Sequence, residues 1–257
     1  MKRRSLAPVV GIVLFIALWE GFVRAFQVRK FVLRAPSSAV NYLWRFRGDY
    51  LEAAWITVQH SMLGLLFALV IALFVGALLA SNRFAERATQ PILVLVQVVP
   101  WIAYVSSVVL WLGSGTGPAL FMVTLVCLPA FIFATVDGMR SVEPATLELM
   151  SSVDASHREV LFRVRLPSAA PTLFTTARFN VGLALAIAYY VEGANFSNEG
   201  IGAIGKKAAA SGDPFAADRL WAAVFSIALV GIGALMLLSL LERNFLHWHA
   251  AQRTERR

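Results

Sequence analysis

Three long stretches of this sequence carry no charged side chain. They cover residues 53–82, 88–136 and 220–241 and are 30, 49 and 22 residues long. A helix that crosses the hydrocarbon core of a bilayer needs about 20 apolar residues. Only 15% of the chain is charged and 58% is hydrophobic, whereas soluble domains average about 25% charged residues. The sequence therefore predicts a polytopic membrane protein, and it excludes a soluble enzyme, a disordered chain and, with one cysteine, an internal disulfide scaffold.

Six membrane spans are predicted from these stretches and their flanks. The 49-residue stretch is divided by Gly-Ser-Gly-Thr-Gly-Pro at 113–118, which favours turns, so it holds two spans. The first apolar segment is interpreted as a retained anchor because no small-residue cleavage site follows it. The expected spans are 6–22, 55–79, 89–112, 119–136, 172–191 and 221–241. An even number of spans places both termini on one side of the membrane.

The distribution of basic residues favours cytoplasmic termini. In that orientation 14 of the 23 Lys and Arg residues lie inside, as expected from the excess of positive charge in cytoplasmic loops. The net charge of +8 is therefore attributed mainly to topology. Because no surface combines basic with aromatic residues, nucleic-acid binding is not expected.

Two segments outside the spans are predicted to form short helices. In the outer segment, Pro36 and two serines precede an apolar-periodic stretch, which indicates a capped amphipathic helix on the membrane surface. In the inner loop 137–171, Pro144 is placed to begin a helix. A second helix is expected from about Ser156 to Arg165, with a bend near Asp154 and a stop at Leu166-Pro167. An ordinary amphipathic connector lying on lipid headgroups would explain this periodicity equally well.

The inner loop resembles the permease subunits of ATP-binding-cassette importers. Their loop before the penultimate span carries Glu-Ala-Ala, three residues, Gly, and then Leu-Pro thirteen residues after that Gly. Counting back from Leu166-Pro167, Glu148 takes the Glu position and Asp154 the Gly position, while Leu149 and Met150 take the two Ala positions. The Glu, the spacing and the Leu-Pro match, and the two Ala and the Gly do not. Asp visits left-handed backbone conformations more readily than most residues, but less easily than Gly.

The resemblance extends over roughly residues 36 to 248. It is nearest to the nitrate/sulfonate/taurine branch of the binding-protein-dependent importers. The segments that carry it are 99–103, 110–113, 191–193, 199–202 and 241–243, with Trp248.

This resemblance implies an all-α membrane protein with six transmembrane helices, the type I importer permease architecture and a cytoplasmic coupling helix. The implied parts are an N-terminal transmembrane helix (1–26), an outer amphipathic segment (27–54), a core permease domain (55–248) that contains the coupling loop 137–171, and a basic cytoplasmic tail (249–257).

The resemblance also implies partners in a bacterial cytoplasmic (inner) membrane. These are ATP-binding-cassette ATPase subunits, a second permease copy in a homodimer or heterodimer, an extracytoplasmic solute-binding protein and membrane lipid. The chain has no Gly-x-x-x-x-Gly-Lys-Ser/Thr run, so it is not expected to be an enzyme or to hold a cofactor; ATP and Mg would be bound by the partner ATPase. The implied solute is a small anion such as a sulfonate, taurine or nitrate, although the branch also moves uncharged or aromatic nutrient precursors. The implied ATPase-coupling residues are Glu148, Leu149, Met150, Asp154, Ala155, Ser156, His157, Arg158, Leu166 and Pro167.

Glu192 at the end of the fifth predicted span has two interpretations. An ionisable residue at membrane depth is commonly functional, and the resemblance places Glu192 beside the translocation path. A hydrated carboxylate at the outer headgroups is the alternative. Arg178 is expected to extend to the inner interface, Glu20 to be interfacial, and Gly64, Gly76 and Gly182 to allow close helix packing. The four histidines form no convincing metal site, and His247 and His249 beside Trp248 are interpreted as an interfacial anchor.

Two other classes of protein remain open at this point. An ion-gradient-driven secondary transporter would normally have charged or broken helices near mid-membrane, and the uncharged stretch 88–136 offers no carboxylate for coupling. A membrane scaffold or embedded enzyme is the second class, but catalysis would need converging reactive groups. Dependence of transport on ATP and on a separate ATPase chain distinguishes an importer permease from both.

Overall fold

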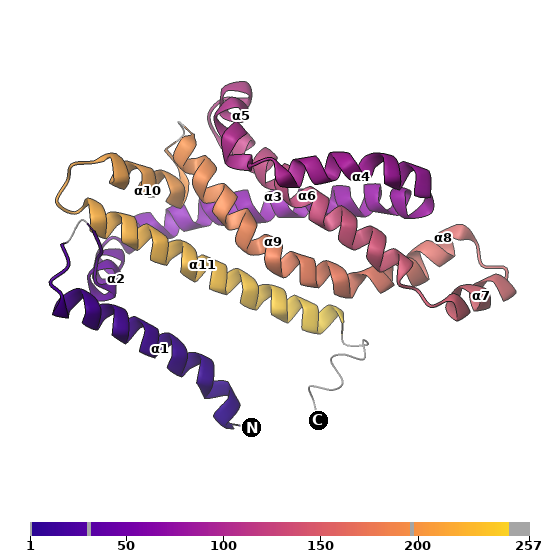
Figure 1. The fold of residues 1–257 in the computed structure, drawn as a ribbon, viewed down its shortest axis with the longest axis horizontal. Helices are drawn as coiled ribbons and strands as arrows, with labels where there is room; N and C mark the ends of the chain where they lie inside the picture. Colours follow the sequence, from indigo (N-terminus) through magenta and orange to yellow (C-terminus); the bar gives the residue numbers. More distant parts are fainter. Residues whose placement is uncertain (1, 30–31, 196–197, 247–257) are drawn as a thin grey trace.

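The computed structural model describes residues 2–29, 32–195 and 198–246, and of residues 2–8 only the backbone. Over these ranges the chain forms helices and no strands, which confirms the predicted all-α architecture (Figure 1). The interpretation of His247, Trp248 and His249 as an anchor, and the tail 249–257, lie outside the described residues.

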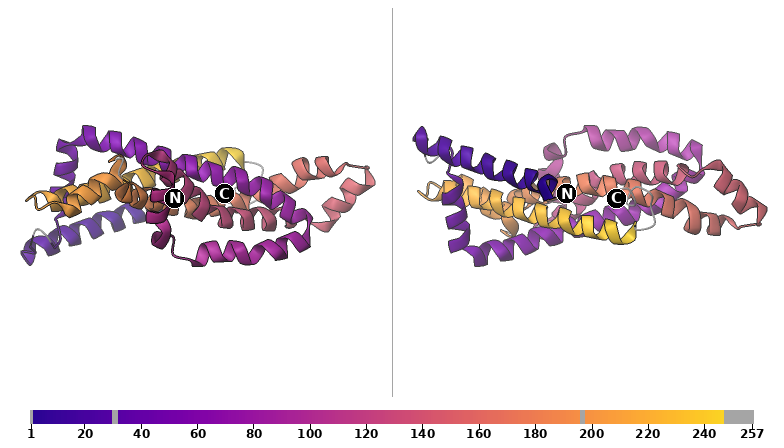
Figure 2. Two further views of the ribbon diagram at one scale, coloured as in Figure 1. Left: turned by 90° about the horizontal axis from the view of Figure 1, so that it is seen from above. Right: turned by 90° about the horizontal axis from the view of Figure 1, so that it is seen from below.

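Five long helices form the body of the molecule, and the three central ones pack against one another. The helices α3, α6 and α9 share a buried core that includes Ala68, Met122, Phe131, Ala184 and Ile187. The helix α11 lies alongside α9, and α1 lies at the periphery (Figure 1 and Figure 2). The bounds are α1 (Lys2–Ala25), α3 (Arg47–Ser81), α6 (Thr116–Arg140), α9 (Leu166–Ala194) and α11 (Ala216–Phe245).

The predicted spans correspond to these helices with one exception. By length and hydropathy α3, α6 and α11 can cross a membrane. The helices α1 and α9 cover the first and fifth predicted spans and have 24 and 29 residues. Both are long enough to cross the hydrocarbon core of a bilayer, which needs about 20 residues of helix. The exception is the third span.

The third predicted span, 89–112, is not one continuous helix. The segment consists of α4 (Arg83–Val98), a 3₁₀ turn (Trp101–Tyr104) and α5 (Val105–Leu112), and its two parts are bent by 82°. The break falls at Pro100, which has no N–H to donate. A residue before proline avoids the helical region, and Val99 is accordingly extended, with φ −67° and ψ 123°. The chain therefore makes a broken or re-entrant pass at this point.

A row of small residues brings α3 against α6. Gly64, Ala68, Ala72 and Gly76 recur at every fourth position and are all buried. A Cβ atom on Gly64 would lie 2.7 Å from the Val123 side chain, and one on Gly76 would lie 2.6 Å from the Thr135 side chain. The predicted packing role of both glycines is confirmed. The same expectation for Gly182 is wrong, because no atom of a neighbouring element lies within 4 Å of a Cβ at that position.

The amphipathic helix α2 (Pro36–Arg45) begins at the predicted proline. Its cap comes from α1 and not from its own serines. Glu20 accepts hydrogen bonds from the Ser37 N–H at 3.0 Å and from the Ser37 hydroxyl at 2.7 Å, so a carboxylate lies at the N-terminus of the helix, where the helix dipole favours it. Glu20 thus links α1 to α2, a role that its assignment as a simple interfacial residue did not include.

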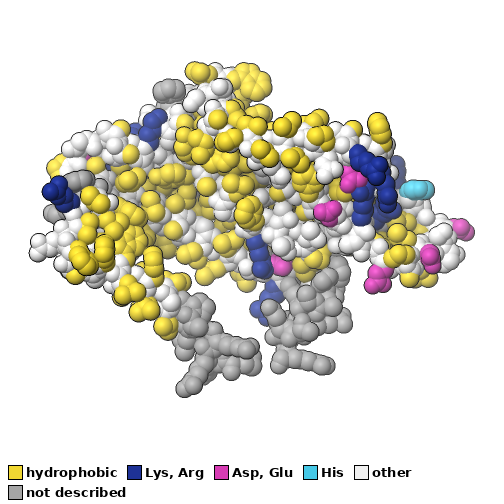
Figure 3. Space-filling view, viewed as in Figure 1, with side chains coloured by type: hydrophobic (Ala, Val, Ile, Leu, Met, Phe, Trp, Pro, Cys, Tyr) yellow, Lys and Arg dark blue, Asp and Glu magenta, His cyan; other side chains and the backbone are white. Residues whose placement is uncertain are grey.

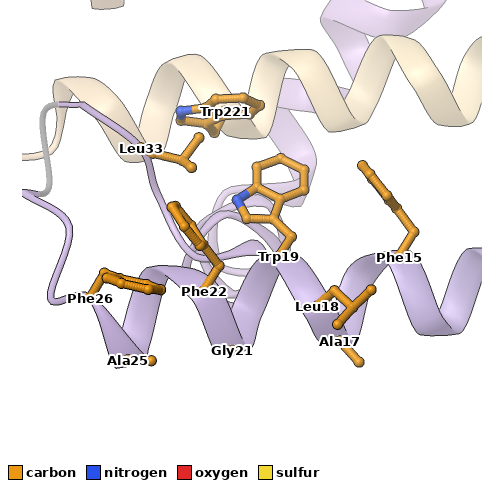
Figure 4. Close-up of a pocket in the computed structure, with 10 residues that line it drawn as sticks. All are labelled: Phe15, Ala17, Leu18, Trp19, Gly21, Phe22, Ala25, Phe26, Leu33 and Trp221. Carbon is orange, nitrogen blue, oxygen red and sulfur yellow. The ribbon is translucent and has the colours of Figure 1, made fainter.

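The helix α1 contacts α11 through a few aromatic side chains. The Trp19 ring lies 5.0 Å from the Trp221 ring and 5.9 Å from the Phe225 ring, measured between centroids. Beside these contacts the two helices enclose an apolar groove of about 960 Å³, into which Phe22 and Leu33 also project (Figure 4). The N-terminal end of α11 is held separately, because Asp218 forms a buried two-bond ion pair with Arg34.

Candidate functional site

The helices α7 (Pro144–Ser152) and α8 (His157–Val160) extend beyond the long helices at one end of the molecule (Figure 1 and Figure 2). The predicted helix start at Pro144 is confirmed, and the preceding Glu143 is extended, with φ −60° and ψ 135°. The face seen in Figure 3 is largely uncharged along its middle, and charged side chains gather at the end that carries α7 and α8. This distribution fits a loop in water at the end of a membrane-embedded body.

The predicted bend at Asp154 is also confirmed, and its geometry explains the residue preference at this position. Asp154 has φ +53°. The Asp154 N–H donates to the Ser151 carbonyl at 3.1 Å, and the Ala155 N–H donates to the Met150 carbonyl at 3.0 Å. These two bonds are those of a Schellman motif, which requires a left-handed residue after the helix. Asp154 thus adopts the conformation for which Gly is the usual choice.

Replacing Asp154 should distinguish this geometric role from a chemical one. We expect Asp154→Gly to keep the bend, whereas Asp154→Val should weaken it by about 2 kcal/mol, because a β-branched residue is strained at positive φ. The measurement is hydrogen exchange at the Ala155 amide, where that loss corresponds to roughly 30-fold lower protection. Equal protection in the two variants would contradict the assignment.

A capping box begins the second loop helix. The Ser156 hydroxyl accepts the Glu159 N–H at 3.3 Å, and the Glu159 carboxylate accepts the Ser156 N–H at 3.0 Å. The hydrogen bonds from the Ser156 N–H and hydroxyl, and then the nearby Arg163 guanidinium, hold the pKa of Glu159 below its ordinary value. The stabilisation of α8 by this carboxylate is therefore present above the ordinary pKa of Glu and is lost as the pH falls through the lowered pKa.

The prediction that Leu166-Pro167 stops this helix is wrong. From α8 the chain passes through a π-helical turn (Leu161–Arg165, η2) directly into α9. The Leu166 N–H donates to the Leu161 carbonyl, five residues back. In a regular α-helix the Pro167 ring would clash with the Arg163 carbonyl, four residues before it. Arg163 lies in the wider π turn, where the expanded backbone leaves room for the ring. The loop helix and α9 consequently form one continuous helical segment.

The loop presents two exposed apolar side chains, one on α7 and one at the C-cap that follows it. Leu149 is 64% exposed and Val153 is 65% exposed, and residues four apart lie on the same side of a helix. Exposed apolar side chains grouped on a segment outside the spans indicate a contact surface for another molecule. Of the residues assigned to coupling, Glu148, Leu149, Asp154, Ser156, His157 and Arg158 are exposed, and Met150, Ala155, Leu166 and Pro167 are half-buried.

A second polar cluster lies near the other end of α9, around Glu192. Glu192 is only 2% exposed. Its carboxylate accepts the Thr57 hydroxyl at 2.8 Å and the Gly202 N–H at 3.0 Å, and it pairs with His60 Nδ1 at 2.9 Å. The Thr57 oxygen in turn accepts the Ile201 N–H at 2.9 Å. The interpretation of Glu192 as a hydrated interfacial carboxylate is therefore wrong, and its assignment to the translocation path stays a prediction.

This Glu192 cluster joins three helices. Thr57 and His60 come from α3, Glu192 from α9, and the two N–H donors from the N-terminus of α10 (Gly200–Ala210). The helix dipole favours a carboxylate at that N-terminus. The chain enters α10 through Gly200 at φ +84°, where a Cβ would lie 2.2 Å from the Glu192 carboxyl carbon. Glu192 and the segment 199–202 are recognisable in the sequence, whereas no role was predicted there for Thr57 and His60, which lie one helical turn apart on α3.

We expect Glu192→Gln to loosen α10. The variant loses the charged acceptor, and hydrogen bonds to charged groups contribute about 1.5–3 kcal/mol. Protection of the Gly202 amide from hydrogen exchange should fall by roughly tenfold or more, with transport reduced and assembly retained. The matched control is Glu199→Gln, since Glu199 is an exposed carboxylate beside the same helix N-terminus. If both variants match the wild type, the cluster does not hold α10.

The basic residue within the fifth predicted span also has an ion-pair partner. Arg178 on α9 forms an ion pair with Glu242 on α11, and its side chain stays 53% exposed. It therefore links α9 to α11.

Comparisons with known proteins agree with this architecture. The family described as binding-protein-dependent transport system inner membrane component matches residues 64–247. The formylaminopyrimidine transport permease protein ThiX of Halalkalibacterium halodurans is 27% identical over 98% of this chain and 100% of its own length. The taurine transport system permease protein TauC of Escherichia coli is 26% identical over 97% of this chain and 92% of its own.

Solved structures of low sequence identity share the fold. A chain of the inward-facing MetNI methionine ABC transporter superposes with a TM-score of 0.60 at 19% identity, covering 76% of this chain and 98% of its own. A chain of a bacterial ABC transporter involved in the import of alginate superposes with a TM-score of 0.61 at 15% identity, covering 94% of this chain and 96% of its own.

Proposed function

The chain belongs to the family of binding-protein-dependent transport system inner membrane components, and from this premise we propose that it forms the solute path of an ATP-driven importer and is coupled to a separate ATPase by its α7–α8 loop. It is a multi-pass permease subunit. The observation that carries the coupling proposal is the exposed apolar face of Leu149 and Val153 on a loop held rigid by the Asp154 bend and the Ser156 capping box.

The loop has the mechanical properties that coupling requires. A joint with an ATPase needs a short rigid helix with an apolar face to bury and polar ends to orient it, and α7 has both. Because α8 continues through the π turn into α9, a movement of the loop would shift α9 without an intervening flexible segment. ATP binding by two partner ATPases would draw their loops together and so tilt α9, which is one route to alternating access.

The other partners follow from the same premise. ATP and Mg would be held by the ATPase subunits, and an extracytoplasmic binding protein would deliver the solute. Exposed apolar side chains along α1, α4 and α11, such as Leu14, Leu95 and Leu237, would face lipid or a second permease copy, in a homodimer or a heterodimer. With the loop in the cytoplasm, both termini would also be cytoplasmic, in agreement with the excess of Lys and Arg there.

The proposed solute is a small anion such as a sulfonate, taurine or nitrate. The similarity to TauC over nearly the whole chain supports this class, and the similarity to ThiX favours a nitrogen heterocycle as the second candidate.

The test is uptake by the complex purified from native membranes and reconstituted into liposomes with its binding protein. We expect [³⁵S]taurine uptake that requires internal ATP, not ADP, and that persists without an ion gradient. Uptake driven by a gradient without ATP would overturn the importer proposal. ATP-dependent uptake of a heterocyclic probe such as formylaminopyrimidine in place of taurine and nitrate would overturn only the solute class.

A further inference from the structure

The corner at which α2 meets α3 carries two arginines stacked on aromatic rings. Phe46 alone separates the two helices. The Arg47 guanidinium lies over the Trp44 ring, 5.3 Å from its centroid, and donates a hydrogen bond to the Trp44 carbonyl at 3.3 Å. The Arg45 guanidinium lies over the Phe46 ring at 5.8 Å. These contacts hold both cations at the surface of the corner.

The positive charge of this corner is not neutralised by a carboxylate. Among the residues that the structure describes, the ion pairs include neither Arg45 nor Arg47. The Trp44 carbonyl uses one N–H group of Arg47, whereas a guanidinium has five. Asp49, the nearest acidic residue along the chain, lines a pocket with Lys207 and Arg219 of α10 and α11. The corner therefore retains both the charge and the free N–H donors to bind an anion.

An apolar stripe leads from this corner along α3. Leu51 is 68% exposed and Trp55 is 63% exposed. They follow Arg47 at intervals of four residues, which places all three on one side of the helix. The Trp44 ring beneath the Arg47 guanidinium is exposed as well. A cation at the start of α3 is thus followed by two turns of exposed apolar surface.

The stripe lies where α3 enters the membrane. The helix has 35 residues, whereas a hydrocarbon core needs about 20. The predicted span begins at Trp55, so Arg47 and Leu51 lie in the two turns before it. The helix α2 runs across the ends of α1 and α3, at the end of the molecule opposite α7 and α8 (Figure 1 and Figure 2). Exposed tryptophans are typical of the boundary between membrane and water.

We propose that the corner formed by α2 and α3 is a binding site for an anionic phospholipid. The Arg47 guanidinium contacts the phosphate, Arg45 adds positive charge, and an acyl chain lies along Leu51 and Trp55. A guanidinium presents its N–H groups in a fork that matches phosphate oxygens, and the order of cation and apolar stripe is that of a headgroup and its chain. The inference does not rest on the transported solute or on the ATPase, because it requires only that the chain is embedded in a membrane.

The direction of the stripe favours a lipid over the acidic surface of a soluble protein. Farther along α3, Leu66 and Val70 are also exposed, and both lie within the predicted span. A soluble protein could cover the arginines, but it could not follow this surface into the hydrocarbon core. A phospholipid has both parts in one molecule.

The experiment measures lipid selectivity directly beside the corner. The full-length protein, purified with its associated subunits, carries Cys127→Ser, which removes the buried cysteine, and Leu51→Cys, which is labelled with bimane. It is reconstituted into phosphatidylcholine that contains either brominated phosphatidylglycerol or brominated phosphatidylcholine at the same mole fraction. Because bromine quenches a fluorophore only at short range, the ratio of quenching by the two lipids gives the preference for the anionic lipid at residue 51.

We expect a preference for phosphatidylglycerol of at least about fivefold and a fall of about fivefold in Arg47→Gln, which is the effect of one cation beside anionic headgroups. Arg47→Lys keeps the charge and should keep most of the preference. Arg29→Gln is the matched control. Arg29 is exposed in the connection between α1 and α2, at the same end of the molecule, and its replacement should change the ratio less than twofold.

Three results would overturn the site. Equal quenching by the two lipids before Arg47 is replaced would show that the corner does not select for charge. A loss in Arg29→Gln or Arg47→Lys as large as that in Arg47→Gln would show that Arg47 does not act through its own charge at this position. No quenching by either lipid would show that water or protein, and not a lipid chain, covers the stripe.

Discussion

Gly202→Ala should be among the most damaging single-methyl substitutions in this chain. A Cβ at this position would lie 1.8 Å from the Tyr189 carbonyl oxygen and 2.9 Å from the Glu192 Cβ. The first of these atoms belongs to the backbone of α9, so the clash is relieved only if α10 moves away from α9. That movement would break the Gly202–Glu192 hydrogen bond and strain the neighbouring Ile201–Thr57 bond.

The expected loss of unfolding free energy is about 4 kcal/mol, from overpacking of about 1–3 kcal/mol and from the buried Gly202 N–H, which is left without its acceptor at a cost of about 1–3 kcal/mol. In a domain of this size, a loss of about 4 kcal/mol corresponds to a fall in Tm of roughly 10 °C. The measurement is thermal unfolding of the purified complex.

The matched control is Gly182→Ala on α9, because a Cβ there meets no other element within 4 Å and alanine favours a helix. A Tm for Gly202→Ala within about 2 °C of that control would mean that α10 is not packed against α9 as described.

Leu149→Glu should release the partner ATPase. Burying a leucine contributes about 1.5–3 kcal/mol, and a carboxylate left unpaired in an interface costs several kcal/mol more. We expect ATPase affinity to fall at least about 100-fold, because each 1.4 kcal/mol is a factor of ten. The measurement is the Kd of the purified permease for its ATPase in detergent.

Ser151→Glu is the control for this effect. Ser151 is exposed on the same helix α7 and lies two residues from Leu149, so its side chain points to the opposite face. The control adds the same charge to the same helix, and it should change the Kd by no more than about threefold. Similar losses in both variants would show that charge alone, and not the apolar face, governs docking.

The sequence predicted the features that depend on local rules. Uncharged stretches located α3, α6 and α11, Pro144 located the start of α7, and the motif spacing located the bend at Asp154. In each case the determining interaction lies within a few residues: the apolar length of a span, the missing N–H of proline or the backbone preference at a helix end.

The features it missed depend on context. The break at Pro100 lies inside an uncharged stretch whose apolar pattern is the same for one span as for a bent pair. Leu166-Pro167 does not stop the helix, because a π turn accommodates the proline ring. The Glu192 cluster joins residues 132 and 135 positions apart, and no period in the sequence reports a contact of that range. Thr57 and His60 lie three residues apart near the start of the second predicted span, and this spacing of two polar residues within a span is the available signal.

The most direct test of the coupling proposal is site-specific photo-crosslinking in native membranes. Benzoylphenylalanine is placed at residue 149 and, in a second variant, at residue 151, and the crosslinked products are identified by mass spectrometry after irradiation. The account predicts a P-loop ATPase crosslinked from residue 149, with a yield several times lower from residue 151. Crosslinks from residue 149 to lipid alone, with no ATPase at either position, would show that the loop rests on the membrane and would contradict the proposed coupling.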